Sequence, residues 1–422
     1  MYINGVVNPT KRPMSNLSIN PLDLTTGNLT QNEEKKAAGE KILLNLGLQP
    51  LVNNLCLGPA AALAAKKFPL CAIINDDLEI KLNYEVPSDE LYGNYLYFSG
   101  ISSPYINHCR LLWHKVKHLN HDTILDIGGN DGTLLRALQS QSDTKLNLYN
   151  VDACKTFRTM NESSGIKFVH DYFNKDTDVP KANLIFTTNA FQHTPDAEKF
   201  VEGIAEKLDG TWILEFPYTL RTIQTLQFDQ FYHEHYYYWL VKPLKKLFSK
   251  YGLSIYNAEE IDIHGGSMRL WVTNKDIYGK TEAAEKFIKE EEEFDYKEFY
   301  GHCIQKMMED YLFLTKLEGK TAFFGAAAKG CVYLNALKVY GELPKNAYIV
   351  DDTFAKQGKF IPGTGMKVQT RQFFLADNPD NIVILAHNFA GYITQSLRND
   401  GYKGRIIVML PSIYIDQLED HE

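Results

Sequence analysis

The sequence lacks the cysteine pattern of a disulfide-bonded or zinc-binding chain. Its 422 residues contain only six cysteines, at positions 56, 71, 109, 154, 303 and 331, and no two of them form a CxxC pair. Scattered thiols in a chain of this length are typical of a reducing compartment. We therefore expect a cytoplasmic protein.

Basic charge and long apolar runs are also scarce. The formal net charge is −8, and no block of lysine and arginine stands out. This balance argues against a nucleic-acid partner. No apolar run has the length that spans a bilayer, and the first residues lack the apolar core of a signal peptide. We therefore expect no membrane partner.

What the sequence does contain is a repeated strand–helix alternation, and its length predicts two or three domains. Strand-like runs cover 123–127, 146–151, 183–188 and 211–216, with helical patterns between them. Such an alternation predicts a doubly wound α/β domain. Adjacent strand-like runs at 253–258 and 268–273 predict an antiparallel edge pair. The alternation resumes from residue 321, which predicts a second α/β domain.

The remaining segments predict smaller units. Helical patterns cover 32–48 and 59–67, and short strand-like runs cover 70–74 and 78–84. The aromatic, glycine-broken segment 91–99 suits a loop over a pocket. A charged helical region containing Glu290–Glu293 predicts a solvated spacer. We divide the chain into a flexible arm (1–30), an N-terminal lid module (31–110), a first α/β domain (111–275), a helical linker (276–318) and a C-terminal α/β domain (319–422).

The turn after the first strand of the larger α/β domain carries acids rather than a phosphate-binding pattern. The sequence LDIGGNDG at 125–132 lacks the GxGxxG spacing. Asp126 and Asp131 place negative charge beside the turn, which repels a phosphate but suits a sulfonium ligand that bears an ammonium group. An ordinary glycine turn is the alternative.

Acids at the ends of later strands support a ligand at this turn. Asp152 ends the next strand, where an acid can bind both ribose hydroxyls. Asp171 lies where an adenine would be. The sequence therefore predicts an S-adenosylmethionine site. Its residues are Asp126, Gly128, Gly129, Asn130, Asp152, Asp171 and Asn189.

The sequence YHEH at 232–235 has residue types that suit either metal ligation or proton transfer. Side chains two residues apart diverge on a helix, and a zinc site needs further ligands. We therefore favour general acid–base chemistry, with hydrogen-bonded structural histidines as the alternative. His193, which follows the strand that ends near Asn189, lies at the edge of the sheet where ligands bind.

Two stretches of the C-terminal half have features of phosphate sites. FGAAAKG at 324–330 follows a strand, and Lys329 adds positive charge beside small residues. The segment 356–368 is a basic loop punctuated by glycines. Close packing of a helix on a strand explains these small residues equally well.

Taken together, the motifs resemble the S-adenosylmethionine-dependent C-methyltransferases that act on nucleotide-linked keto-deoxysugars. They cover most of the chain, from about residue 46 to 411. They are LYGNYLYFSGISS (91–103), LDIGGNDGTLL (125–135), NAFQHTPD (189–196), EFPY (215–218), FDQFYHEH (228–235), HGGSMR (264–269), GAAAKG (325–330), KQGKFIPGT (356–364) and LAHNF (385–389).

The resemblance implies a fold and a set of site residues. It implies a class I methyltransferase (Rossmann-like) domain, a C-terminal α/β domain that helps to hold the nucleotide diphosphate, and a small N-terminal lid module. The implied catalytic residues are His235 as the base, with Glu234, Tyr232, His193 and Tyr97. The implied substrate contacts are Tyr95, Ser99, Glu215, Lys329, Lys356 and Asn388.

The sequence departs from this family in its N-terminal module. Family members carry a zinc module built from cysteine pairs, but Asn75 and Leu78 stand where one pair would align, and no cysteine precedes Cys56. Structural zinc needs four nitrogen or sulfur ligands. We therefore expect no zinc. His387 also stands where a tryptophan is usual in the family.

The resemblance implies an enzyme that removes the proton beside the ketone of a nucleotide-linked sugar (dTDP or a similar nucleotide) and methylates that carbon. In this hypothesis, Glu234 orients or tunes His235, and Tyr232 and His193 stabilise the enolate oxygen. The first alternative is a sugar O-methyltransferase, and the second is a non-catalytic protein that binds sugar nucleotides. The oligomeric state is open, with a monomer slightly favoured.

Overall fold

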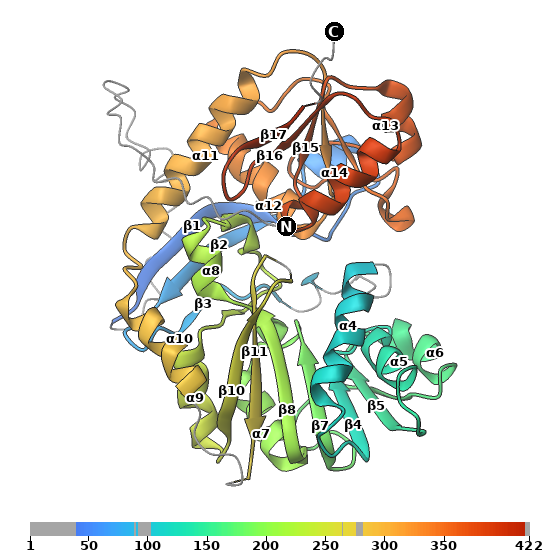
Figure 1. Cartoon of the computed structure of the whole chain (residues 1–422). Coiled ribbons are helices and arrows are strands. Elements are labelled where there is room, and N and C mark those ends of the chain that lie inside the picture. Colours follow the sequence, from blue (N-terminus) through green and yellow to red (C-terminus); the bar gives the residue numbers. More distant parts are fainter. Residues whose placement is uncertain (1–38, 88–89, 92–102, 264, 276–281, 418–422) are drawn as a thin grey trace.

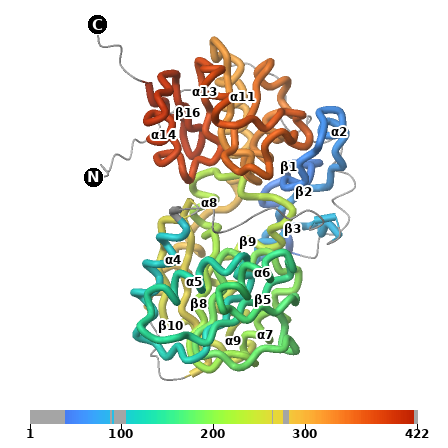
Figure 2. Tube along the Cα trace, turned by 90° about the vertical axis from the view of Figure 1, so that its right-hand side faces the viewer, coloured from blue at the N-terminus to red at the C-terminus, as the bar shows by residue number. Residues whose placement is uncertain are grey.

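The computed structural model describes residues 39–87, 90–91, 103–263, 265–275 and 282–417. Within these ranges the strands form sheets of seven, six and four strands. The seven-stranded and six-stranded sheets belong to two α/β layers stacked one above the other, and the four-stranded sheet lies beside their junction (Figures 1 and 2).

The seven-stranded sheet has the order β10-β11-β8-β7-β4-β5-β6. Its strands are β4 (Thr123–Ile127), β5 (Asn147–Asp152), β6 (Lys167–His170), β7 (Ala182–Thr188), β8 (Leu208–Pro217), β10 (Ser254–Ile261) and β11 (Ser267–Thr273). Pairing is parallel from β6 to β8, whereas β11 is antiparallel to both β8 and β10. This is the class I methyltransferase fold, and the predicted antiparallel edge pair is confirmed.

Alternate residues of these strands are buried on opposite faces of the sheet, as the pleat requires. Ile124 and Phe186 contribute to one apolar cluster, and their neighbours Leu125 and Ile185 contribute to another. The first cluster includes side chains of α4 (Ser103–Val116) and α5 (Thr133–Gln139), and the second includes side chains of α7 (Ala197–Lys207) and α9 (Val241–Lys250). The short helices η4 (Lys155–Phe157) and α6 (Arg158–Glu162) connect β5 and β6.

The C-terminal sheet has the order β14-β13-β12-β15-β16-β17 and is parallel except for its last strand. Its strands are β12 (Thr321–Phe324), β13 (Tyr348–Val350), β14 (Val368–Gln369), β15 (Asn381–Ile384), β16 (Arg405–Val408) and β17 (Tyr414–Asp416). The helical segments between them are α12 (Ala328–Leu337), η7 (Lys338–Tyr340), η8 (Phe354–Lys356), α13 (Arg371–Asp377), η9 (His387–Phe389) and α14 (Ala390–Asn399).

The small sheet corrects one expectation from the sequence. Its strands are β1 (Lys41–Pro50), β2 (Lys67–Ile74), β3 (Ile80–Leu82) and β9 (Tyr237–Tyr238), and the helix α2 (Pro59–Leu63) lies between β1 and β2. The predicted helix over 32–48 is wrong within its described part, because β1 pairs with β2 along its whole length. Two irregularities in that pairing break the strict alternation of a strand, so its apolar spacing also fits a helix.

The linker forms two helices, α10 (Glu282–Glu293) and α11 (Phe299–Thr315). The expectation that Glu290–Glu293 is a solvated run is wrong for Glu291, which is fully buried. Its carboxylate accepts hydrogen bonds from the backbone N–H groups of Val241 (2.7 Å) and Lys242 (2.9 Å) at the start of α9. The charged run therefore anchors the linker to the larger domain as well as facing solvent.

None of the helices in the described part of the chain combines the length and the apolar character needed to cross a membrane.

Candidate active site

The turn after β4 is built around glycines at close backbone contacts. Gly128 has a φ of 72°, and its N–H donates to the carbonyl of Val151 (2.8 Å). A Cβ on Gly129 would lie 2.5 Å from an Asp126 carboxylate oxygen and 2.6 Å from the Asn150 side-chain oxygen. No larger residue fits there without a shift, so the sequence pattern has a steric cause.

Acceptor atoms around this turn are buried without protein donors. Both carboxylate oxygens of Asp126 and the side-chain oxygens of Asn150 and Asn189 have no hydrogen-bond partner among the described residues. Burial, with the charges of Asp152, Glu215 and Asp131, raises the pKa of Asp126 to about 8. A buried acceptor without a donor is unfavourable. These residues therefore fit the ammonium group of a methyl donor, which supplies N–H donors and positive charge.

The two other predicted donor-site acids lie at the same edge of the sheet. Asp152 ends β5 and accepts hydrogen bonds from the backbone N–H groups of Asn130 (2.9 Å) and Cys154 (2.8 Å). Burial raises its pKa. Asp171 follows β6 and accepts a hydrogen bond from the Thr177 hydroxyl (2.8 Å). Their assignments to ribose and adenine stay predictions.

The YHEH segment is neither a helix nor a metal cluster in the described structure. It follows the single turn η6 (Phe228–Gln230) and leads into β9, which pairs with β3. Its side chains diverge. His233 lies with its Nε2 atom 3.3 Å and 3.2 Å from the carbonyl oxygens of Phe68 and Pro69 in β2, and burial lowers its pKa to about 4. Within the described ranges, no three His, Cys, Asp or Glu side chains come together in a way that could hold a metal ion.

Glu234 has a partner from the N-terminal module. Its Oε1 atom accepts a hydrogen bond from the Asn53 side-chain amide (2.7 Å). Burial raises the pKa of Glu234 to about 7, although the bond from Asn53 opposes the shift. The Glu234 carboxylate is thus directed to the N-terminal module, because the segment turns here and the N–H of His235 donates to the carbonyl of Tyr232 (3.0 Å). Its expected role of orienting or tuning His235 stays a prediction.

His235 lies among aromatic rings. Its ring centroid is 4.8 Å from that of His193 and 4.0 Å from that of Tyr232. Burial and the nearby His193 and Lys329 hold the pKa of His235 well below its usual value. His193 belongs to η5 (Phe191–His193), and its Nδ1 atom lies 2.8 Å from the carbonyl oxygen of Glu234. The structure thus brings together three of the predicted catalytic residues around a neutral imidazole.

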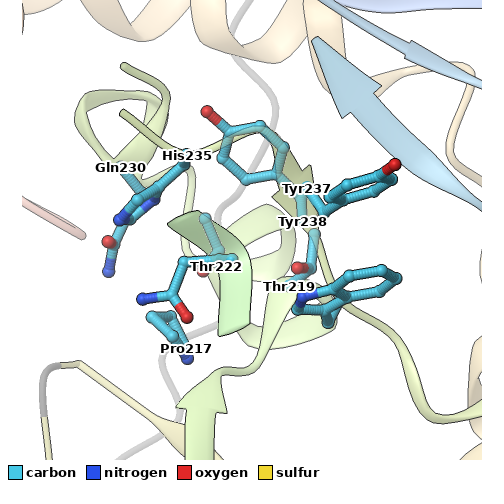
Figure 3. A pocket seen from close by; sticks show the side chains of 9 residues that line it. Pro217, Thr219, Thr222, Gln230, His235, Tyr237 and Tyr238 are labelled. Carbon is cyan, nitrogen blue, oxygen red and sulfur yellow. The ribbon is translucent and has the colours of Figure 1, made fainter. Parts of the chain in front are cut away.

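A small pocket opens beside this cluster. It lies between the end of β8, the helix α8 (Thr219–Gln224) and the segment that leads into β9. Gln230 and His235 line one side of it, and Tyr237 and Tyr238 line another (Figure 3). Gln192 also lines the pocket, and its side-chain amide donates to the carbonyl of Asn189 (2.9 Å). Gln192 therefore contacts both the pocket and Asn189, a residue of the predicted donor site.

Glu215 is more enclosed than its predicted role as a substrate contact requires. It is fully buried near the end of β8. One carboxylate oxygen accepts a hydrogen bond from the Arg269 side chain (2.6 Å), and the other lies 2.7 Å from Nε2 of His108. Sequence reasoning missed His108. Its position in a helical pattern just after the SGISS motif was the signal that could have found it.

The predicted contacts of the C-terminal domain lie at the ends of its strands. Lys329 stands in the first turn of α12, and burial lowers its pKa to about 8 against the opposing charge of Asp229. Lys356 lies 3.4 Å from a carboxylate oxygen of Asp351, just after β13. Asn388 lies in η9, next to the turn at Gly265. Their roles toward a substrate stay predictions.

Three predicted residues, Tyr95, Tyr97 and Ser99, lie outside the described residues.

Comparisons with known proteins give two family matches. Residues 108–258 match the family model described as methyltransferase domain. Residues 262–411 match the model described as C-methyltransferase C-terminal domain. A curated relative, C-methyltransferase NovU of Streptomyces niveus, is 25% identical over 396 residues, and the match covers 87% of this chain and 92% of the relative.

Solved structures of methyltransferases are also similar to part of this chain. An S-adenosylmethionine-dependent methyltransferase of Clostridium acetobutylicum ATCC 824 is 15% identical, covering 44% of this chain and 95% of that one, with a TM-score of 0.31. Magnesium protoporphyrin IX methyltransferase of Synechocystis PCC 6803, with bound SAM, is 14% identical, covering 41% and 79%, with a TM-score of 0.32.

Proposed function

The chain is a methyltransferase of the family that carries the C-methyltransferase C-terminal domain, and from this premise we propose that it methylates the carbon beside the ketone of a nucleotide-linked sugar. The methyl donor is S-adenosylmethionine, which supplies an electrophilic methyl group. The observation that carries the proposal is the neutral, buried His235. It lies against His193 and Tyr232, at a pocket that adjoins the predicted donor site.

Each proposed step has a group of this chain to perform it. His235 takes the proton from the carbon next to the ketone, and the electron pair of that C–H bond forms the enolate. Tyr232 holds the enolate oxygen by a hydrogen bond from its hydroxyl, which stabilises charge most where water is excluded. His193, whose Nδ1–H donates to the carbonyl of Glu234 (2.8 Å), positions this segment. The enolate carbon then bonds to the methyl group as the bond from that group to sulfur breaks. Glu234, whose pKa burial raises to about 7, is the residue proposed to tune His235.

The C-terminal domain supports the nucleotide part of the substrate. Lys329 and Lys356 both lie at the carboxyl edge of its parallel sheet, where ligands of open α/β sheets bind. Phosphate oxygens are suited to such lysines. We propose that the two lysines bind the diphosphate and that the sugar lies toward His235. All six cysteines are free, which supports a reducing, cytoplasmic site of action.

The test of the base is proton exchange without methyl transfer. The wild-type enzyme, given a keto-sugar nucleotide in deuterated water and no methyl donor, is expected to exchange the proton next to the ketone. His235→Asn is expected to slow this exchange by about a hundredfold or more, since general base catalysis contributes a factor of that order. His302→Asn, at an exposed position on helix α11, is the matched control. If His235→Asn keeps full exchange and turnover, His235 is not the base.

The product distinguishes the proposal from its alternatives. Carbon methylation gives a C–CH3 signal in the NMR spectrum of the sugar, whereas an O-methyltransferase gives an O–CH3 signal. A non-catalytic binding protein gives neither signal, although it still binds the sugar nucleotide in a calorimetric titration. A screen of keto-sugar nucleotides by mass spectrometry identifies the substrate.

A further inference from the structure

His108 is held at the edge of the larger sheet by a buried ion pair. Its Nε2 atom lies 2.7 Å from Glu215, and Glu215 in turn accepts a hydrogen bond from Arg269. The Glu215 and Arg269 side chains are 0% and 3% exposed, whereas the His108 side chain is 14% exposed. Of these three side chains, only His108 is partly exposed to solvent, whereas Glu215 and Arg269 are buried.

The ion pair fixes which ring nitrogen is available. Burial alone would raise the pKa of Glu215, but the hydrogen bond from His108 and the charge of Arg269 bring it below its ordinary value. An ionised carboxylate is only an acceptor, so Nε2 of His108 must carry a proton and donate it. The Nδ1 atom is left for another partner, and it has no hydrogen bond among the described residues.

Helix α4 places this ring beside the donor site. The Tyr105 hydroxyl lies 3.0 Å from Oγ1 of Thr188 at the end of β7, one residue before Asn189. The backbone N–H of Asn189 donates to the carbonyl of Glu215 (2.8 Å). The charge of Glu215 also contributes to the raised pKa of Asp126. His108, Asn189 and Asp126 therefore border the same end of the predicted donor site.

The methionine end of the donor carries an ammonium group and a carboxylate, and the two need opposite partners. The acids around the turn suit the ammonium group but repel the carboxylate. Two nearby arginines are already engaged, because Arg136 donates to the carbonyl of Asp131 and Arg269 is held by Glu215 and Glu259. A histidine whose second nitrogen is available supplies the missing donor when that nitrogen also carries a proton.

We propose that His108 binds the α-carboxylate of S-adenosylmethionine through Nδ1–H, with Glu215 and Arg269 as positioning residues that hold the ring. This assignment rests on the donor site proposed above. It replaces the direct contact of Glu215 with the sugar that the sequence predicted.

The test compares two ligands that differ only in this carboxylate. Calorimetric titration with S-adenosylmethionine and with decarboxylated S-adenosylmethionine gives a ratio of dissociation constants for each variant. The wild type is expected to favour the intact donor by about tenfold or more, the value of one charge-assisted hydrogen bond. His108→Ala is expected to reduce this ratio to near one while its affinity for the decarboxylated ligand changes little. His114→Ala, an exposed position on the same helix, keeps the wild-type ratio.

The outcomes separate this inference from the proposed function. If the wild type binds neither ligand, the donor site itself is wrong. If it binds the intact donor and His108→Ala weakens both ligands equally, the donor site stands and the carboxylate assignment is wrong. If His108→Ala does not fold, judged by circular dichroism, His108→Phe replaces it, because that ring keeps the packing but has no N–H.

Discussion

The burial of Asp126 is unfavourable for the stability of the folded chain but suits a positively charged ligand. Its carboxylate is 1% exposed and has no hydrogen-bond donor among the described residues. In an unfolded chain an aspartate has a pKa of about 3.9. Burial and the neighbouring acids raise it to about 8, so the folded protein holds this proton at neutral pH. Stability from this group is therefore greatest at low pH and falls as the pH rises toward 8.

We predict that binding of the methyl donor releases a proton from Asp126. The ammonium group favours the ionised carboxylate, so the pKa of Asp126 falls in the complex. At pH 7, titrations in buffers of different ionisation enthalpy should show this release. Asp126→Asn should abolish it and weaken binding by about tenfold or more, since a hydrogen bond between charged groups is lost. Asp122→Asn, an exposed acid before the same strand, should change neither. Undiminished proton release from Asp126→Asn would contradict the assignment.

Other residues show which features of the site can be predicted from the sequence and which cannot. The glycine turn and the strand-end acids could be placed because a βα unit brings them to one edge whatever the rest of the chain does. The position of Glu215 near the end of its strand could be predicted in the same way, but its hydrogen-bond partners could not. Arg269 contacts Glu215 from the neighbouring strand β11, and His108 contacts it from α4. Contacts between elements far apart in the chain leave no local pattern.

At the scale of elements, the strand β9 joins the N-terminal module to the segment that contains His235. The backbone of this strand pairs with β3, and the N–H of Leu82 donates to the carbonyl of Tyr236 (2.9 Å). The sheet that closes the module therefore contains the chain directly after His235. The sequence suggested a lid module without this pairing, because a two-residue strand is too short to be recognised from its own pattern.

We predict that Asn53 positions Glu234 and that the effect depends on pH. Its amide donates to the carboxylate, and such a bond is stronger when the carboxylate is ionised. Asn53→Ala should therefore lower the free energy of unfolding by about 1.5–3 kcal/mol at pH 8, above the pKa of Glu234. The loss should be smaller at pH 5, where the group is protonated.

Urea denaturation at the two pH values measures this difference. Asn54→Ala, at the exposed neighbouring position, is the matched control and should show no dependence on pH. The prediction also carries a sign for Glu234 itself. Loss of the bond from Asn53 should raise its pKa further above 7, because that bond opposes the effect of burial. An equal loss of stability at both pH values would mean that Asn53 contributes through packing and not through its hydrogen bond to Glu234.

At the scale of the whole molecule, the proposed catalytic residues lie where three parts of the chain meet. His235 belongs to the larger α/β domain, Asn53 to the N-terminal module and Lys329 to the C-terminal domain. Helix α8 lies between the two larger domains in both views (Figures 1 and 2). His387 of the C-terminal domain also reaches the larger domain, with Nδ1 3.4 Å from Asp229 and Nε2 3.1 Å from Gln227. Charges of one domain thus act on the residues of another.

This arrangement leads to a prediction that distinguishes the two lysines of the C-terminal domain. The positive charge of Lys329 lowers the pKa of His235, so the imidazole stays neutral and able to accept a proton at low pH. Lys329→Met removes that charge and should raise the pKa of His235. Activity is lost as the pH falls through this pKa, so the acidic limb of kcat/KM should move to higher pH. Lys356 is held by Asp351 and is not among the charges that shift His235.

Lys356→Met is therefore the matched control for the pH profile. Both substitutions should raise KM for the nucleotide-linked sugar, because each removes a charge proposed for the diphosphate. Only Lys329→Met should also move the acidic limb, which a loss of substrate binding alone would not do. Steady-state rates across pH 5 to 8 measure both effects. If the two variants give the same profile, the C-terminal domain binds substrate without influencing the base, and the electrostatic link between the domains is wrong.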